Sequence, residues 1–236
     1  MFLHKSNFLM RAVYPDFQWK VKTNEKVIYL TFDDGPIPDI TDAVLECLAA
    51  YNAKATFFCI GDNIQKHPDV FNRVIAQGHS IGNHTFNHLR GWATEEEVYL
   101  TNFQQCEEVI RNKVELRVGE MPLFRPPHGR IKKGQAKVIL QTHEIVMWDV
   151  LTGDFSADLS PERVLQKTLK YTESGSIVVF HDSLKAEKKM LYALPRMLQH
   201  FSELGYVFSP LTSPLAPRGG TYTRQIKRRL SSPFGG

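Results

Sequence analysis

The chain has 236 residues, of which 42% are hydrophobic and 23% are charged, a composition typical of a soluble globular protein with one well-filled core. No stretch approaches the roughly 18 consecutive apolar residues that a membrane helix needs. The formal net charge of +4 arises from the tail after Pro217, which holds five basic residues and no acid, so the body of the chain is near neutral and nothing predicts nucleic-acid binding.

Segments typical of strands and helices alternate along the chain. In order, we expect a strand at 26–33, a helix at 38–52, a strand at 55–61, a helix at 68–78, a strand at 79–84, a helix at 95–114, a strand at 123–127, a helix at 133–142, a strand at 144–150, a helix at 161–172, a strand at 176–180, a helix at 186–204 and a strand at 205–211. Strands separated by helices of this size predict βα units around a parallel sheet.

The number of βα units favours a small or incomplete TIM-type barrel over a doubly wound open sheet. No glycine-rich phosphate loop follows the first strand, so a nucleotide site has no support. We therefore divide the chain into an N-terminal extension (1–19), one barrel (20–212) and a basic tail (213–236). The tail is rich in Gly and Ser and is expected to be disordered, either as a solvated terminus or as a contact for an anionic surface.

Ionisable residues follow the predicted strands at the ends where the catalytic groups of parallel β/α barrels lie. They are Asp33, Asp34, His84, His88, Arg125, Asp154, His181 and Asp182. Each of them alone has an ordinary structural explanation, such as a turn or a helix cap. Their meeting at one predicted rim points to a catalytic site.

Two histidines and one carboxylate form a hydrolytic zinc site when a coordination position stays open for water. Here the tandem Asp33-Asp34 can supply one metal ligand and one general base, and His181 can supply an acid for a leaving amine. The segment His84-Thr-Phe-Asn-His88 has no glutamate after its first histidine, so it is not the helix motif of zinc proteases.

Four segments resemble, in order, the motifs of the NodB-homology polysaccharide deacetylases (carbohydrate esterase family 4): Thr31-Phe-Asp-Asp-Gly35, His84-Thr-Phe-Asn-His88, Arg125-Pro-Pro-His-Gly129 and Val179-Phe-His181. The resemblance covers about residues 20–212. It implies a single distorted (β/α)7 barrel and metal-dependent deacetylation of N-acetylated sugars in a polysaccharide or oligosaccharide, peptidoglycan-like or chitin-like.

Residue roles follow from the same resemblance. It makes Asp33 the general base, with Arg125 positioning it, and His181 the catalytic histidine, with Asp154 as its partner. It also makes Asp34, His84 and His88 the ligands of a divalent metal ion. Zinc suits this donor set best, and cobalt or nickel also fits.

The sequence departs from the family pattern at three places around the expected substrate cleft. His128 stands where the family usually has tyrosine, at a position whose backbone N–H would help to hold the oxyanion. Phe155 replaces a tryptophan and Val179 a leucine, and both keep the acetyl-methyl pocket apolar. Trp92 is a further candidate for the cleft wall, whereas Trp148 is expected in the core.

Two other functions are open to this sequence. One is a metal-dependent hydrolase of a non-sugar amide, and the other is a non-catalytic glycan-binding module. A binding module has no need to keep Asp33, Arg125, Asp154 and His181 together, so the deacetylase is favoured.

The sequence gives weaker indications of the redox environment and the location of the protein. Its three cysteines, Cys47, Cys59 and Cys106, are far apart and odd in number, so they predict neither a disulfide framework nor a cysteine zinc site. The N-terminus lacks the apolar core of a secretory signal. We therefore expect a cytoplasmic location, with association to the cell envelope left open.

Overall fold

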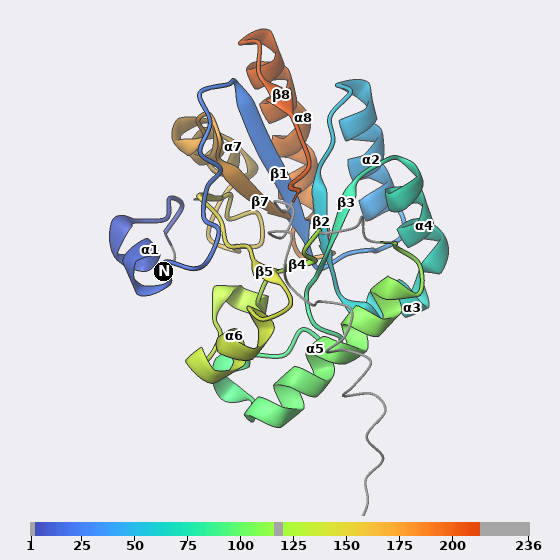
Figure 1. Cartoon of the computed structure of the whole chain (residues 1–236). Coiled ribbons are helices and arrows are strands. Elements are labelled where there is room, and N and C mark those ends of the chain that lie inside the picture. The colour runs from blue at the N-terminus through green and yellow to red at the C-terminus, as the bar shows by residue number, and fades with distance from the viewer. Residues whose placement is uncertain (1–2, 116–119, 213–236) are drawn as a thin grey trace, which may run out of the picture.

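The computed structural model describes residues 3–115 and 120–212 (Figure 1). The expected basic tail, 213–236, lies outside these residues. No helix in the described ranges is long and apolar enough to span a bilayer.

Seven strands form one curled parallel sheet. In chain order they are β1 (Val27–Asp33), β2 (Thr56–Cys59), β3 (Ser80–Asn83), β4 (Leu123–Phe124), β5 (Glu144–Ile145), β6 (Val150–Leu151) and β7 (Ile177–His181). Their order across the sheet is β5-β4-β3-β2-β1-β7-β6, and the short β8 (Val207–Phe208) pairs with the start of β1. This order follows the chain cyclically around a barrel. In a doubly wound sheet, the strand order would instead reverse at a switch point. The predicted barrel is therefore confirmed.

Helices cover the outside of the sheet (Figure 1). They are α2 (Ile40–Ala50), α3 (Gly61–Lys66), α4 (Pro68–Ala76), α5 (Glu96–Arg111), α6 (Lys133–Ile139), α7 (Pro161–Tyr171) and α8 (Glu187–Glu203), with 3-10 turns at Gly91–Ala93 and Pro127–Gly129. The short helix α1 (Phe8–Val13) lies apart from the sheet and buries none of its residues. Helices α1 and α3 were not predicted. The start of α7 is set by Ser160, whose hydroxyl accepts a hydrogen bond from the Arg163 N–H, and by Pro161 in the first turn.

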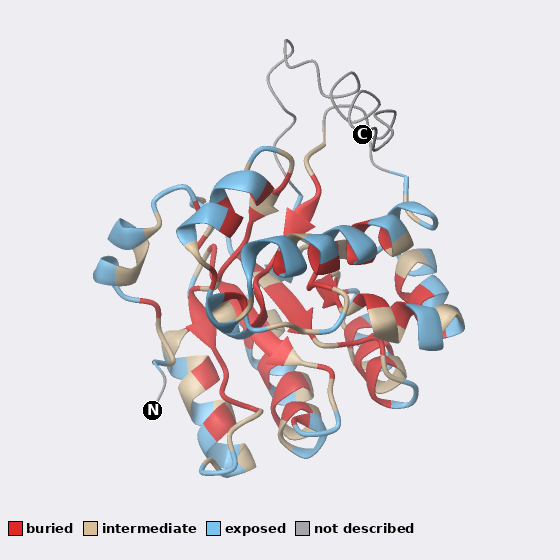
Figure 2. Cartoon of the chain, turned by 90° about the horizontal axis from the view of Figure 1, so that it is seen from below, coloured by how far each residue is buried: buried red, intermediate tan, exposed pale blue. Residues whose placement is uncertain are grey.

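The core lies between the strands and the inward faces of the helices, and the outward faces are exposed (Figure 2). On β1, Ile28, Leu30 and Phe32 have no exposed surface. The Phe32 ring packs against Phe57 of β2 and Phe180 of β7, with ring centroids 5.0 and 6.0 Å away. Because these strands are buried on both sides, their sequences are almost continuously apolar.

The prediction of one strand at 144–150 was wrong. The segment forms two short strands at opposite edges of the sheet, since β5 pairs with β4 and β6 pairs with β7. Residues 146–149 cross the opening between these edges. The ring of strands is therefore closed by the chain itself and not by a ladder of hydrogen bonds between β5 and β6.

The N-terminal extension runs along the same opening. Gln18 exchanges backbone hydrogen bonds with Ile145 and Met147 at the β5 edge, at 2.9 and 2.7 Å. Farther up the chain, Ser6 donates to the Asp149 carbonyl oxygen, at 2.9 Å. The extension thus supplies part of the backbone pairing that the two edge strands do not give each other.

A buried ionic cluster ties α5 to the sheet beneath the site. Glu107 lies 2.7 Å from Arg111 and 2.9 Å from His143, and it also accepts a hydrogen bond from Asn83 at the end of β3. Burial alone would raise the pKa of Glu107, but His143 and Arg111 outweigh it and lower the pKa to about 2. The carboxylate therefore stabilises the fold fully above its ordinary pKa of 4.5, and this contribution is lost as the pH falls toward 2.

We expect Glu107→Gln to lower the free energy of unfolding by about 3 kcal/mol at pH 6, because it removes one partner of a buried ion pair. The difference in the free energy of unfolding between the variant and the wild type should become smaller as the pH falls from 6 to 3. Urea unfolding across this range measures it, with the exposed neighbour Glu108→Gln as the matched control. A difference that stays constant with pH would contradict the assignment.

Candidate active site

A cavity of about 770 Å³ opens at the carboxyl ends of the strands. Eight of the predicted site residues line it: Asp33, Asp34, His84, His88, His128, Phe155, Val179 and His181. Arg125 and Asp154 are fully buried behind it. Side chains from segments far apart in the sequence thus meet at the rim that the strand ends predicted.

Asp34, His84 and His88 form a compact cluster of potential metal ligands. Their ligand atoms all lie within 4.8 Å of one another. Oδ1 of Asp34 is 3.7 Å from Nε2 of His84 and 3.3 Å from Nε2 of His88. This oxygen is buried and has no hydrogen-bond partner among the described residues. A buried carboxylate oxygen without a partner, facing two imidazole nitrogens, fits a site for a divalent cation.

Neighbouring groups fix the orientation of these ligands. Nδ1 of His84 lies 2.7 Å from the Arg125 carbonyl oxygen, which can only accept, so Nδ1 carries the proton and Nε2 is free to bind a metal. Burial lowers the pKa of His84 to about 4, which keeps the ring neutral. The Asn63 side chain donates to the Asp34 carbonyl oxygen at 2.7 Å. Asp34 and His88 both have left-handed backbone, with φ of 86° and 56°, a strained conformation of the kind that clusters at functional sites.

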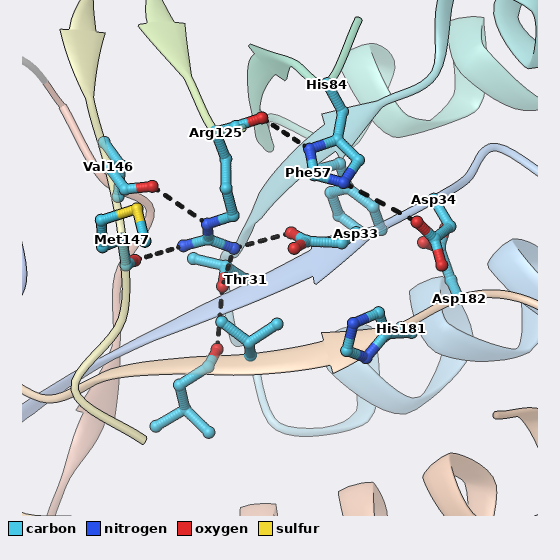
Figure 3. Close-up of polar contacts among 12 residues, drawn as sticks. Thr31, Asp33, Asp34, Phe57, His84, Arg125, Val146, Met147, His181 and Asp182 are labelled. Atoms are coloured by element: carbon cyan, nitrogen blue, oxygen red, sulfur yellow. Dashed lines mark hydrogen bonds and ion pairs between the residues drawn. The ribbon is translucent and has the colours of Figure 1, made fainter. Parts of the chain in front are cut away.

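Asp33 lies beside this cluster and is held by Arg125 (Figure 3). The guanidinium Nη1 donates to Oδ1 of Asp33 at 2.6 Å and to the Thr31 hydroxyl at 2.7 Å. Its other nitrogens donate to the carbonyl oxygens of Val146 and Met147. The carboxylate of Asp33 is thereby fixed at the end of β1, with its charge balanced by a buried cation.

His181 and Asp154 form a second pair on the β7 side of the cavity. The Asp154 carboxylate accepts one hydrogen bond from the His181 N–H and one from its ring Nδ1, both at 2.8 Å. Burial alone would lower the pKa of His181, but the carboxylates of Asp154, Asp34 and Asp33 together outweigh burial and raise the pKa to about 9. The imidazole is therefore protonated at neutral pH and can act as an acid.

The His128 backbone forms the turn at the other side of the metal cluster. His128 and Gly129 both have positive φ, of 57° and 65°. The His128 N–H has no acceptor within the described ranges, and its ring centroid lies 4.6 Å from that of His88. An unpaired backbone N–H on a residue whose ring lies beside the cluster is the kind of donor that can hold a developing oxyanion.

Around the apolar part of the cavity wall, the two tryptophans Trp92 and Trp148 do not lie where the sequence predicted them. Val179 and Phe155 lie where the sequence placed them, and the Phe155 ring contacts His181 edge to face at 5.0 Å. Trp148, expected in the core, is half-buried and lines the cavity. Trp92 does not line it but packs edge to face on the His128 ring, with centroids 5.4 Å apart.

Sequence reasoning did not find two positioning residues. Asn63 was missed because it belongs to the unpredicted helix α3. Asp182 was placed at the rim but given no role, yet its buried carboxylate accepts hydrogen bonds from the Gly35 N–H at 3.0 Å and the Thr41 hydroxyl at 2.6 Å. It thus shapes the loop that carries Asp33 and Asp34, and its direct succession to His181 was the only signal in the sequence.

Comparison with known proteins agrees with this geometry. The polysaccharide deacetylase family matches residues 20–144. A peptidoglycan-N-acetylglucosamine deacetylase of Bacillus cereus is 34% identical over 80% of this chain and 88% of its own length. A chitooligosaccharide deacetylase of Azorhizobium caulinodans is 33% identical over 73% of this chain and 81% of its own.

A solved structure agrees as well. The crystal structure of the Bc1960 peptidoglycan N-acetylglucosamine deacetylase, in complex with 4-naphthalen-1-yl-N-oxidanyl-benzamide, superimposes with a TM-score of 0.78 at 28% identity. The match covers 87% of this chain and 95% of that one. Together with the family match, this confirms the resemblance seen in the motifs: the chain belongs to the polysaccharide deacetylase family.

Proposed function

We propose that the protein hydrolyses the N-acetyl groups of an N-acetylated glycan, releasing acetate and a free sugar amine. The observation that carries the proposal is the arrangement of two charged pairs around one ligand cluster. Asp33 and His181 line the same cavity as Asp34, His84 and His88, and each is paired with a buried partner behind it, Arg125 and Asp154 respectively. Amide hydrolysis needs a base for water and an acid for the amine, and this site offers both.

Asp34, His84 and His88 would hold the metal ion, and zinc is our proposal because two imidazoles and one carboxylate are a usual zinc donor set. When bound, the ion supplies Lewis acidity at the acetyl group and makes water easier to deprotonate. This proposal is supported by the unpartnered Oδ1 of Asp34 and by the fixed tautomer of His84.

The proton transfers and the binding of the oxyanion would be carried out by residues of the chain itself. Asp33, held by Arg125, takes a proton from the attacking water. The His128 N–H donates to the oxygen anion that develops at the acetyl carbonyl. His181 then gives its proton to the departing sugar nitrogen, and Asp154 balances the charge of the imidazolium before that step. Val179 and Phe155 bound the space in which the acetyl methyl group would lie.

The test is acetate release from a panel of N-acetylglucosamine oligomers, soluble peptidoglycan fragments, O-acetylated oligosaccharides and simple non-sugar amides. We expect release from N-acetylated glycans with added zinc. Turnover of the simple amides alone would contradict the proposal, and turnover of the O-acetyl esters alone would redirect it to ester hydrolysis.

Metal binding can be tested without catalysis. His84→Ala should weaken zinc binding by more than about 100-fold, the upper end of the loss when only a supporting partner of a ligand is removed. Asp33→Asn should bind zinc as the wild type does but lose activity. Calorimetric titration of chelator-stripped proteins with zinc measures both. Equal zinc affinity in wild type and His84→Ala would refute the ligand assignment.

The pH profile should report the His181–Asp154 pair. Since Asp154 raises the pKa of His181 above its ordinary value, the acid form persists at neutral pH and is lost at higher pH, which gives kcat/KM an alkaline limb. Asp154→Asn removes the main raising influence, so the limb should move to lower pH. The exposed Asp158→Asn serves as control. An unmoved limb in Asp154→Asn would show that another group sets it.

His128→Tyr separates the backbone donor from the side chain. Because tyrosine keeps the N–H, kcat should stay within about tenfold of the wild type, against the roughly 10²–10³-fold loss expected when an oxyanion donor is removed. KM or the preference among glycans should change instead. Steady-state kinetics on two acetylated oligosaccharides decides: a hundredfold fall in kcat at unchanged KM would mean that the imidazole takes part in the reaction.

A further inference from the structure

The first residues of the chain reach the catalytic cavity. Leu3 and Met10 line it together with the acid, the base and the metal cluster, although they come from the N-terminal extension. Residues 3–13, called the strap below, consist of a short extended segment followed by α1 (Figure 1). None of the catalytic roles proposed above uses them.

Backbone hydrogen bonds hold the strap on the outer edge of β6. The Leu151 N–H donates to the His4 carbonyl oxygen at 2.9 Å, and Nδ1 of His4 lies 2.9 Å from the Leu151 carbonyl oxygen. Lys5 forms an antiparallel bridge with Val150. The side chain of Leu151 lines the cavity too, so the strap continues a wall that β6 begins.

A buried carboxylate anchors the strap from below. Asp149 has no exposed surface, and it binds Nζ of Lys5 at 2.7 Å and Nη2 of Arg11 at 2.5 Å. The Ser176 hydroxyl donates to it as well, at 2.6 Å. Both cations come from the strap. Because a buried charge is costly without its partners, Asp149 favours the docked position of the strap over a detached one.

Met10 of the strap is shared by two cavities. It borders both the catalytic cavity and a smaller apolar cavity of about 290 Å³, and Gly129, next to His128, borders the same two. Phe8, on the same helix, is 78% exposed and lines neither. Met10 and Leu3 therefore border the cleft, although Leu3 is 53% exposed, whereas Phe8 faces solvent away from it.

We propose that the strap forms a subsite for the sugar unit next to the one that loses its acetyl group, with Leu3 and Met10 contacting the apolar C–H face of that ring. The inference rests on the proposed function. A cavity of about 770 Å³ lies within the range of about 300–1,000 Å³ typical of clefts that bury a whole ligand, so it has room beyond one acetamide. Leu3 and Met10 are specificity-determining residues in this arrangement, and Asp149 is a positioning residue.

The experiment compares the Leu3→Ala/Met10→Ala double variant with Phe8→Ala over N-acetylglucosamine oligomers of two to five units. For the longer oligomers we expect the double variant to raise KM about fivefold to tenfold, because it removes apolar contact area, with kcat within about twofold. The shortest oligomer turned over should be affected least. Phe8→Ala should match the wild type throughout. A double variant that matches Phe8→Ala at every length would overturn the proposal.

Binding gives a readout that does not depend on turnover. In the Asp33→Asn background with zinc bound, calorimetry should show the same loss of affinity for the longer oligomers when Leu3 and Met10 are replaced. Asp149→Asn removes the charge that holds the strap without altering its apolar residues, so it should lower the affinity for the longer oligomers in the same way. Asp149→Glu keeps the charge and should restore part of that affinity. If the wild type releases acetate from no glycan, the proposed function fails. Binding that is independent of Leu3 and Met10 would refute the subsite alone.

Discussion

Arg125 lies in the middle of the barrel, and its guanidinium has no contact with solvent. The donors of such a group must be paired inside the protein, and those of Arg125 are. It binds Asp33 and Thr31 on β1 and the carbonyl oxygens of Val146 and Met147 on the segment that crosses from β5 to β6. One side chain thus ties the first strand, the fourth strand and the closing segment together. The same contacts place the carboxylate of Asp33 where the chemistry would need it.

The backbone of Arg125 extends this role to the metal cluster. Its carbonyl oxygen fixes the tautomer of His84 while its side chain holds Asp33. The positions of base and ligand are therefore set by one residue at the end of β4. His181 and Asp154 form a separate unit on the opposite side, joined to the first through the strand pairing of β1 and β7. This division lets the acid and the base lie in different electrostatic surroundings.

The sequence predicted most of the sheet because the longer strands are buried on both faces and stand out as apolar runs, as in β1 and β7. Placing polar residues at strand ends then located the cluster and both charged pairs. The prediction of one strand at 144–150 failed because its apolar residues belong to two edge strands and to the segment that crosses between them. Hydrophobic periodicity cannot distinguish this arrangement from a single strand. The contribution of Leu3 and Met10 was not foreseeable either. It depends on ion pairs to Asp149 that join residues more than a hundred positions apart.

The opening between β5 and β6 has a consequence for how the chain can be shortened. With the strap in place, His4 pairs with Leu151 of β6, and Ser6 pairs with Asp149 of the crossing segment just before it. Without it, backbone groups along β6 and the crossing segment would face solvent with no partner, beside the uncovered apolar residues Leu151 and Met147. An unpaired edge next to apolar surface is a template for pairing with another molecule. We therefore expect the strap to protect the barrel against self-association and its removal to favour aggregation.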